Sequence, residues 1–354
     1  MSDDIEQMIT TFRAGLRGKP NYAYNLAGLA EVVAHKKVPL RALEVAREAL
    51  AAAGDDPRAA TRARRLMAGL IPGYHVPMMN DARRNETWDR ALRRAIRPGM
   101  HVLEIGTGAG MLALMAARAG ATVTTCDTQP VVAQLARELV VRNGLAERIT
   151  VLTRSSRELQ PADLPRPADL LFCDIFGDNL FDFEPLPLIA DAQARLLASG
   201  APVLPRAVSL QVALGWSPDL RNTVRDTCGF DLSPMRDFVS AAHILRIGDP
   251  DIRLLSQPQQ AFRFDFTGSS QRGEIELGLQ AEQDCEVNGA IYWIKLELDD
   301  ENVLEARPEP GLRFFSSPSF APFAVPQTLK AGDAVRIGVA HRGKVLETWI
   351  AGHG

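Results

Sequence analysis

Residues 102–110 read VLEIGTGAG, a short apolar run followed by three glycines at alternate positions. Residues 111–119 then show the apolar spacing of a helix. A strand that passes through a glycine-rich bend into a helix is typical of the first unit of a parallel α/β sheet. There, glycines let the backbone approach a ligand at the carboxyl end of the strand. This segment therefore predicts a ligand-binding α/β fold.

The segments that follow alternate in the same way. Further strands are expected at 121–126, 149–152 and 169–173, and further helices at 130–143 and 185–198. Strands that alternate with helices predict βαβ units and a parallel, Rossmann-like sheet.

Two further parts flank this sheet. Residues 1–72 are rich in Ala, Leu and Arg at helical spacing, whereas from about residue 206 apolar and polar residues alternate between turns, as in antiparallel strands. We therefore expect a helical segment at 1–72, a ligand-binding domain at 73–205 and a β domain at 206–354. The helical segment is expected to be a cap on the α/β domain, with a tetratricopeptide-like hairpin as the alternative.

Composition and charge argue against nucleic-acid binding, secretion, membrane insertion and a structural metal. The 354 residues carry a net charge of −3, which gives no basic footprint for nucleic acid. The beginning MSDDIEQ lacks the apolar core of a secretory signal, and no apolar run is long enough to cross a bilayer. The four cysteines lie far apart without a C-x-x-C pair, so we expect no structural metal and no disulfide framework. Cys126 and Cys173 end apolar runs and are expected to be buried thiols. A cytoplasmic protein without nucleic-acid or membrane partners is expected.

The spacing of the glycines indicates the ligand. A dinucleotide loop reads G-x-G-x-x-G, but Met111 stands at its last position. Glu104 would fit poorly beside a pyrophosphate, because a carboxylate favours positive charge. It suits the cationic amino-acid part of S-adenosyl-L-methionine. Gly106, Gly108 and Gly110 are therefore expected to cradle S-adenosylmethionine.

Two later strand ends add expected ligand contacts. Asp127 closes the second strand, where an acidic side chain can accept hydrogen bonds from both ribose hydroxyls. Ser156 and Glu158 follow the third strand, and either can hydrogen-bond an adenine; a solvated loop is the alternative.

These motifs resemble the protein arginine N-methyltransferases from about Met78 to the C-terminus. The resemblance rests on MMNDARRN at 78–85, VLEIGTGAG, Asp127, Asn143-Gly144, Asp174-Ile175-Phe176, Leu186-Pro187 and the change of pattern after Val203-Leu204-Pro205. It implies a class I methyltransferase sheet followed by a β-barrel, S-adenosylmethionine as cofactor and a homodimer. It also implies that Arg84 grips the cofactor carboxylate, since arginine binds a carboxylate bidentately, and that Met79 lies near the sulfonium.

The same resemblance places a substrate clamp of two carboxylates in CDIFGDNLFDFEPLP at 173–187. Paired carboxylates orient a guanidinium and localise its charge. Asp174 stands at the first family position, but the second falls on Phe183. We therefore expect Asp174 and Glu184, one residue later, to be catalytic, with Asp182 in reserve.

The β domain departs from the family in one motif. Where the family has Thr-His-Trp this chain reads Pro318-Ser319-Phe320, and His243 and His341 are expected to be structural or exposed. The leading hypothesis is N-methylation of a guanidino group in a peptide, a protein or a small molecule such as free arginine. The alternatives are a methyltransferase for a small-molecule amine or hydroxyl, and an inactive S-adenosylmethionine-binding scaffold.

Overall fold

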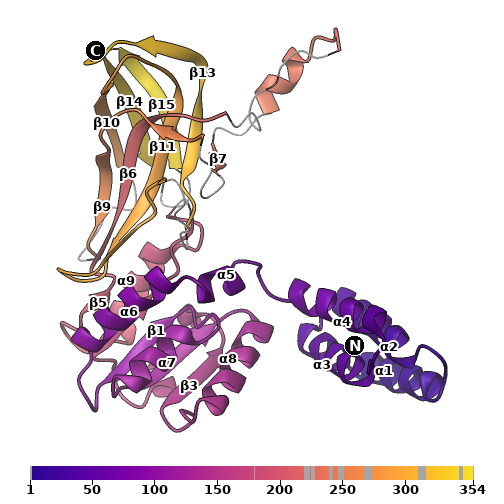
Figure 1. Ribbon diagram of the computed structural model, residues 1–354. Helices are drawn as coiled ribbons and strands as arrows, with labels where there is room; N and C mark the ends of the chain where they lie inside the picture. The colour runs from indigo at the N-terminus through magenta and orange to yellow at the C-terminus, as the bar shows by residue number, and fades with distance from the viewer. Residues whose placement is uncertain are drawn as a thin grey trace. The chain divides into compact units, whose positions relative to one another are not determined.

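The computed structural model describes residues 2–178, 180–218, 224, 228–238, 242–245, 251–266, 273–309, 316–342 and 346–353 (Figure 1). The chain divides into two compact units. One comprises residues 1–80, 107–114 and 125–155, and the other comprises residues 81–106, 115–124 and 156–354.

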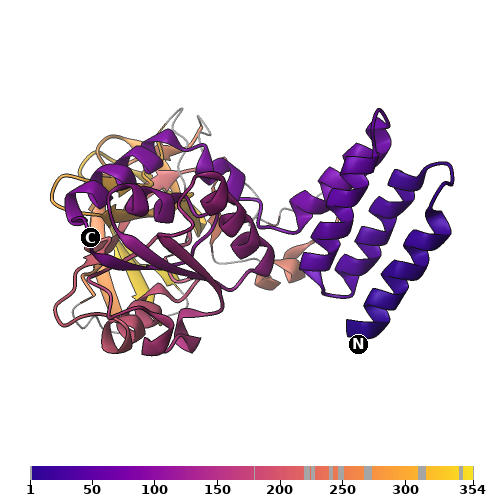
Figure 2. The same cartoon turned by 90° about the horizontal axis from the view of Figure 1, so that it is seen from below.

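The first unit begins with four helices that lie side by side (Figure 2). Apolar side chains from all four, many of them Ala, form one buried cluster. Asp56 caps the fourth helix by accepting hydrogen bonds from the N–H groups of Arg58 and Ala59. The helical N-terminal segment expected from the sequence is thus confirmed. The four helices are α1 (Ser2–Leu16), α2 (Tyr22–His35), α3 (Pro39–Ala52) and α4 (Pro57–Gly69).

Five strands form one sheet in the order β3-β2-β1-β4-β5. β1 pairs in parallel with β4, and β4 pairs in parallel with β5. β1 and β4 are buried along their whole lengths, and β4 accordingly reads as a continuous apolar run, LLFC. The expected Rossmann-like alternation is confirmed. The elements are β1 (His101–Ile105), α7 (Met111–Arg118), β2 (Thr122–Asp127), α8 (Pro130–Arg142), β3 (Ile149–Thr153), β4 (Leu170–Cys173), α9 (Pro185–Arg195) and β5 (Val203–Leu204).

The second unit also holds two antiparallel sheets. One has the order β7-β13-β11-β6-β8, with β9 on β6 and β12 on β11, and the other has the order β10-β14-β15. The long strands are β6 (Ala207–Trp216), β9 (Gln259–Phe264), β10 (Gly273–Gln280), β11 (Cys285–Glu297), β13 (Ser319–Leu329), β14 (Ala334–His341) and β15 (Leu346–His353). The short ones are β7 (His243–Ile244), β8 (Arg253–Leu254) and β12 (Val303–Glu305).

The expected β-barrel is not closed in the part of the chain that the structure describes. Ser256 and Ala281, just outside β8 and β10, form an isolated bridge, and the side chain of Gln259 in β9 donates to the carbonyl of Gly278 in β10 at 2.7 Å. Apolar side chains of both sheets, among them Leu214, Leu279 and Val339, belong to one buried cluster. The antiparallel domain is therefore confirmed, but its core is filled from two facing sheets, as in a sandwich.

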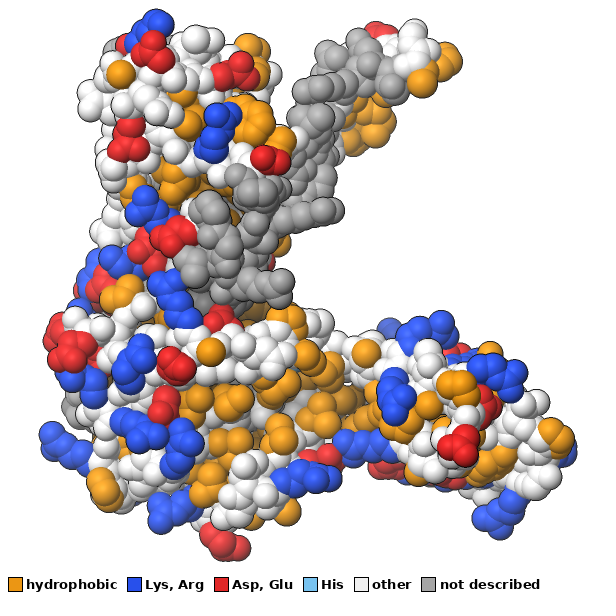
Figure 3. Space-filling view, in the orientation of Figure 1, with side chains coloured by type: hydrophobic (Ala, Val, Ile, Leu, Met, Phe, Trp, Pro, Cys, Tyr) orange, Lys and Arg blue, Asp and Glu red, His pale blue; other side chains and the backbone are white. Residues whose placement is uncertain are grey.

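On the face drawn in Figure 3, basic and acidic side chains are interspersed, as the near-neutral composition suggests. Among the described residues no helix has the length and apolarity that a membrane span needs.

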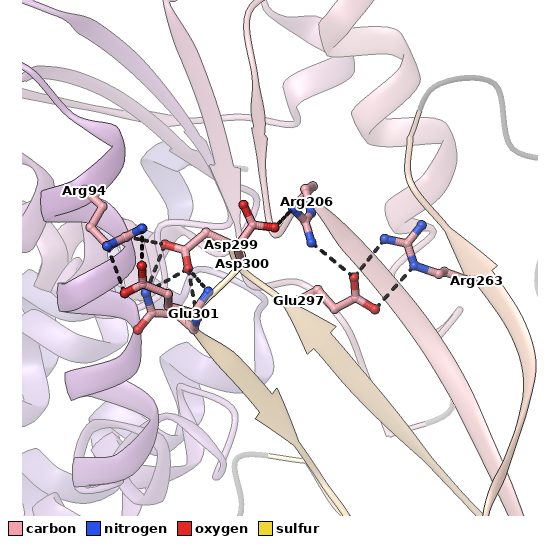
Figure 4. Close-up of polar contacts among 8 residues, drawn as sticks. Arg94, Arg206, Arg263, Glu297, Asp299, Asp300 and Glu301 are labelled. Carbon is pink, nitrogen blue, oxygen red and sulfur yellow. Dashed lines mark hydrogen bonds and ion pairs between the residues drawn. The ribbon is translucent and has the colours of Figure 1, made fainter.

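A turn after β11 anchors α6 (Ala82–Ala95) to the β domain (Figure 4). Asp299 accepts hydrogen bonds from the N–H groups of Glu301 and Asn302, both at 2.8 Å. Arg94 of α6 contacts Asp299 at 3.3 Å and Glu301 at 2.8 Å. Since α6 also carries Arg84, this turn helps to position a candidate site residue. The neighbouring pairs in Figure 4 involve Arg206, Arg263, Glu297 and Asp300.

We expect Asp299→Ala to lower the free energy of unfolding by about 1–2 kcal/mol, because the backbone N–H groups of Glu301 and Asn302 lose a charged acceptor. Burial raises the pKa of Asp299, but hydrogen bonds from Glu301 and Asn302 outweigh this and lower it on balance from 3.8. The stabilisation is therefore present above the unfolded-state pKa and is lost as the pH falls through the folded-state pKa. Urea unfolding at several pH values measures this. Asp300→Ala is the control, since its side chain is 82% exposed; equal losses in the two variants would contradict the role of the turn.

Candidate active site

The glycine bend after β1 requires glycine for two different reasons. Gly106 has a φ of +86° and Gly108 has a φ of +51°, both in the left-handed region. A Cβ on Gly106 would also lie 2.4 Å from Cγ2 of Ile175, the residue that follows Asp174. The bend therefore packs directly against the expected clamp loop. Gly110 is also left-handed, and its N–H donates to the carbonyl of Thr107 at 2.8 Å.

Asp127 at the end of β2 contacts the same bend. Its Oδ2 accepts a hydrogen bond from the N–H of Gly108 at 2.9 Å, and its Oδ1 accepts one from the N–H of Gln129 at 2.8 Å. A carboxylate oxygen can accept two hydrogen bonds. Asp127 can therefore hold the bend and still accept hydrogen bonds from a sugar diol.

α5 (His75–Met79) brings a histidine to this bend, which the sequence analysis missed. A Cβ on Gly108 would lie 3.6 Å from Nδ1 of buried His75. Burial lowers the pKa of His75, and the charge of Asp127 partly offsets this. The adjacent Tyr74 packs on the imidazole with ring centroids 4.6 Å apart. Met79, the expected sulfonium neighbour, is the last residue of α5 and is half-buried.

Glu104 lies buried in β1, opposite Phe172 of β4. Burial is the main reason that the pKa of the Cys173 thiol is raised, and the negative charges of Asp174 and Glu104 raise it further. Glu104 lies near the carboxyl end of β1 and Asp174 directly follows β4, which pairs with β1. Both are thus at the edge where α/β sheets bind ligands.

Arg84 and Asp174 form a buried ion pair. Asp81 caps α6 by accepting the N–H of Arg84 at 2.9 Å, which fixes the start of that helix. Oδ2 of Asp174 accepts from Nε of Arg84 at 2.7 Å and from Nη2 at 2.6 Å. The two side chains are only 5% and 4% exposed. Oδ1 of Asp174 is buried and has no hydrogen-bond partner among the described residues.

Glu184 contacts a different arginine. It precedes α9 with a left-handed φ of 51°, and Nη2 of Arg157 lies 3.2 Å from its Oε2. The expected reserve residue Asp182 is exposed and folds over Gly177, where an added Cβ would lie 2.5 Å from its Oδ2. The structure thus pairs each expected clamp carboxylate with an arginine of the chain itself.

The two expected adenine contacts differ in burial. Ser156, at the start of η1 (Ser156–Glu158), is buried, and its Oγ has no hydrogen-bond partner within the described part of the chain. Glu158 is exposed. A buried hydroxyl without a partner marks a position where a ligand can bond.

The clamp loop is also tied to the β domain, which the sequence analysis did not foresee. Oδ1 of Asp178 accepts a hydrogen bond from the N–H of Ser317 at 2.6 Å and one from the hydroxyl of Ser316 at 3.2 Å. Burial raises the pKa of Asp178. No local pattern signals this contact, because its partners are 138 and 139 residues apart.

His243 and His341 of the β domain pack against aromatic rings. His243 lies 5.6 Å from buried Phe320 between ring centroids, on a strand that pairs with the Pro318-Ser319-Phe320 segment. His341 is buried and stacks on Phe181 of the clamp loop at 5.2 Å.

We expect Gly106→Ala to cost about 2–5 kcal/mol of stability, because left-handed strain adds to overpacking against Ile175. Gly108→Ala is the matched control: its Cβ would make only an ordinary 3.6 Å contact, so about 1–2 kcal/mol of strain is expected. Urea unfolding of both variants measures the difference. If both lose the same stability, the bend is not tightly packed on the clamp loop.

Comparisons with known proteins agree with this architecture. A model of the ribosomal protein L11 methyltransferase (PrmA) family matches residues 90–201. A solved structure of the Trypanosoma brucei PRMT1 enzyme–prozyme heterotetrameric complex with AdoHcy has the same fold, with a TM-score of 0.70 and 20% identity over 80% of this chain and 94% of that chain.

Two curated relatives carry arginine methyltransferase names. The protein arginine N-methyltransferase 7 of Oryza sativa subsp. indica is 32% identical over 65% of this chain and 36% of its own length, so this chain spans about a third of that relative. The arginine N(omega)-methyltransferase of Streptomyces achromogenes subsp. streptozoticus is 34% identical over 276 residues, 76% of either chain. The chain therefore belongs to the family of S-adenosylmethionine-dependent arginine N-methyltransferases.

Proposed function

We propose that this protein transfers a methyl group from S-adenosyl-L-methionine to a guanidino nitrogen of arginine. The observation that carries the proposal is Oδ1 of Asp174, a buried oxygen without a hydrogen-bond partner among the described residues. An unpaired buried acceptor costs about 1–3 kcal/mol, and more when it is charged. Such an oxygen suits a cation rich in N–H donors, and a guanidinium is one.

The residues present fit the cofactor, which supplies an electrophilic methyl group when it is bound. Asp127 keeps acceptor capacity for a sugar diol, and Ser156 offers a buried hydroxyl. We assign the cofactor site to the bend glycines and to residues from the flanking elements: Met79, Arg84, Glu104, Gly106, Gly108, Gly110, Asp127, Ser156 and Glu158.

Asp174 and Glu184 are proposed to clamp the substrate. A guanidinium has a pKa above about 12 and is a poor nucleophile while its charge is delocalised. Two carboxylates that accept hydrogen bonds from its N–H groups localise the charge. They also hold the reacting nitrogen in line with the methyl group that is transferred. As the new nitrogen–carbon bond forms, the nitrogen loses a proton, which Asp174 or Glu184 accepts.

The acceptor is proposed to be arginine, either free or in a peptide or protein. The Streptomyces relative is named for arginine, and the rice relative for protein arginine. We also propose a cytoplasmic homodimer. Buried thiols at Cys126 and Cys173 suit a reducing compartment, and the Trypanosoma brucei neighbour is a multi-subunit complex.

Asp174→Asn should lower kcat for arginine methylation by about 100-fold or more, because proton acceptance and orientation are both lost. Mass spectrometry of methylated arginine measures the rate. Asp174→Glu, which restores a carboxylate, should recover part of it even though the buried pair with Arg84 is disturbed. Asp182→Asn is the control. A wild-type protein that methylates no guanidino compound would contradict the proposed function.

Asp127→Asn should weaken S-adenosylmethionine binding by about 10- to 100-fold in calorimetry, because charge-assisted hydrogen bonds to the ribose are lost. Asp56→Asn is a matched control, since Asp56 likewise accepts two backbone N–H groups at a helix start but lies in the N-terminal helices. Unchanged affinity in Asp127→Asn would contradict the assignment of the ribose site.

A further inference from the structure

Each proposed clamp carboxylate already contacts a guanidinium of this chain, but the two contacts differ in kind. Arg84 and Asp174 are almost completely buried, with side chains 5% and 4% exposed. The side chains of Arg157 and Glu184 are 48% and 28% exposed and meet at 3.2 Å. A substrate guanidinium can bond the open Oδ1 of Asp174 without displacing Arg84, whereas at Glu184 it meets Arg157.

We propose that Arg157 is a specificity-determining residue that competes with the substrate guanidinium for Glu184. The inference rests on the proposed function, since it needs Glu184 as a clamp residue. Arg157 then restricts which ligands can bind Glu184: a ligand displaces Arg157 only when it carries a guanidinium or an equally strong hydrogen-bond donor. Simple amines, with compact charge and no planar fork, replace it less well.

The Arg157–Glu184 contact is held from both sides by the same helix. Glu184 immediately precedes α9, and Arg195 at the other end of α9 donates to the carbonyl oxygens of Ser156 at 3.2 Å and Arg157 at 3.4 Å. Asp191 fixes Arg195 through contacts of 2.5 and 2.8 Å. The backbone of Arg157 is thus attached to the helix that presents Glu184, so the pairing follows from the fold.

The contact is nevertheless weak enough to exchange. Half-exposed ion pairs contribute about 0.2–1 kcal/mol. The amino end of α9 carries partial positive charge, which favours the carboxylate of Glu184 and disfavours the guanidinium of Arg157. A substrate that also bonds Asp174 therefore displaces Arg157 at little cost. Glu184 then gains a partner held by both carboxylates.

Arg157→Gln tests the proposal by removing the competitor while keeping a polar side chain. The KM for arginine should fall by about two- to fivefold, the factor that corresponds to the strength of such a pair. The kcat and the KM for S-adenosylmethionine should stay within about twofold. Inhibition by methylguanidine should become tighter by a similar factor, and Arg157→Lys should lie between Arg157→Gln and the wild type.

Two controls separate competition from a structural effect. Arg336→Gln removes a comparably exposed arginine that pairs with Glu276 at 3.2 Å in the β domain, and it should change no kinetic constant. In a Glu184→Gln background, Arg157→Gln should no longer lower the KM for arginine.

An unchanged or raised KM for arginine in Arg157→Gln would overturn the proposal, and so would a shifted KM for S-adenosylmethionine. If the wild type methylates arginine in either case, the proposed function stands and only the competition fails. If the wild type methylates no guanidino compound, both fail together.

Discussion

The buried contact between Arg84 and Asp174 is the constraint on which the rest of the site depends. Its partners lie 90 residues apart and join α6 to the end of β4. A buried ion pair adds little to stability, because desolvation of both charges offsets their attraction. Both short contacts use Oδ2, which leaves the buried Oδ1 of Asp174 without a hydrogen-bond partner among the described residues, and the proposed substrate clamp uses this oxygen.

Three further contacts hold the elements that carry this pair. The Asp299 turn fixes the far end of α6, close packing of Ile175 on Gly106 joins the clamp loop to the bend, and Asp178 ties the same loop to Ser317. A site that must place a nitrogen in line with a methyl group needs such rigidity, because small errors in position cost much of the rate. The β domain thus contributes to the site through the loop that it restrains.

The two carboxylates of the proposed clamp differ in how deeply their contacts with arginine are buried. Asp174 and its partner Arg84 are almost completely buried, whereas Glu184 and its partner Arg157 are partly exposed. In the proposed clamp, Asp174 therefore supplies a fixed hydrogen-bond acceptor, whereas a substrate can bind Glu184 only by displacing Arg157. By the resemblance to the family, the second clamp position falls on Phe183, and the proposed second carboxylate, Glu184, is one residue later.

The local pattern of VLEIGTGAG was enough to predict the sheet, the bend and the class of cofactor, because left-handed glycines and a buried strand leave a signature within a few residues. The same holds for the position of Asp127 at a strand end. The partners of these residues were decided only by the tertiary structure. His75 at Gly108, Arg157 at Glu184 and Ser317 at Asp178 meet across 27 to 139 residues of chain. Such contacts depend on how packed elements bring distant segments together, and no spacing in the sequence records that.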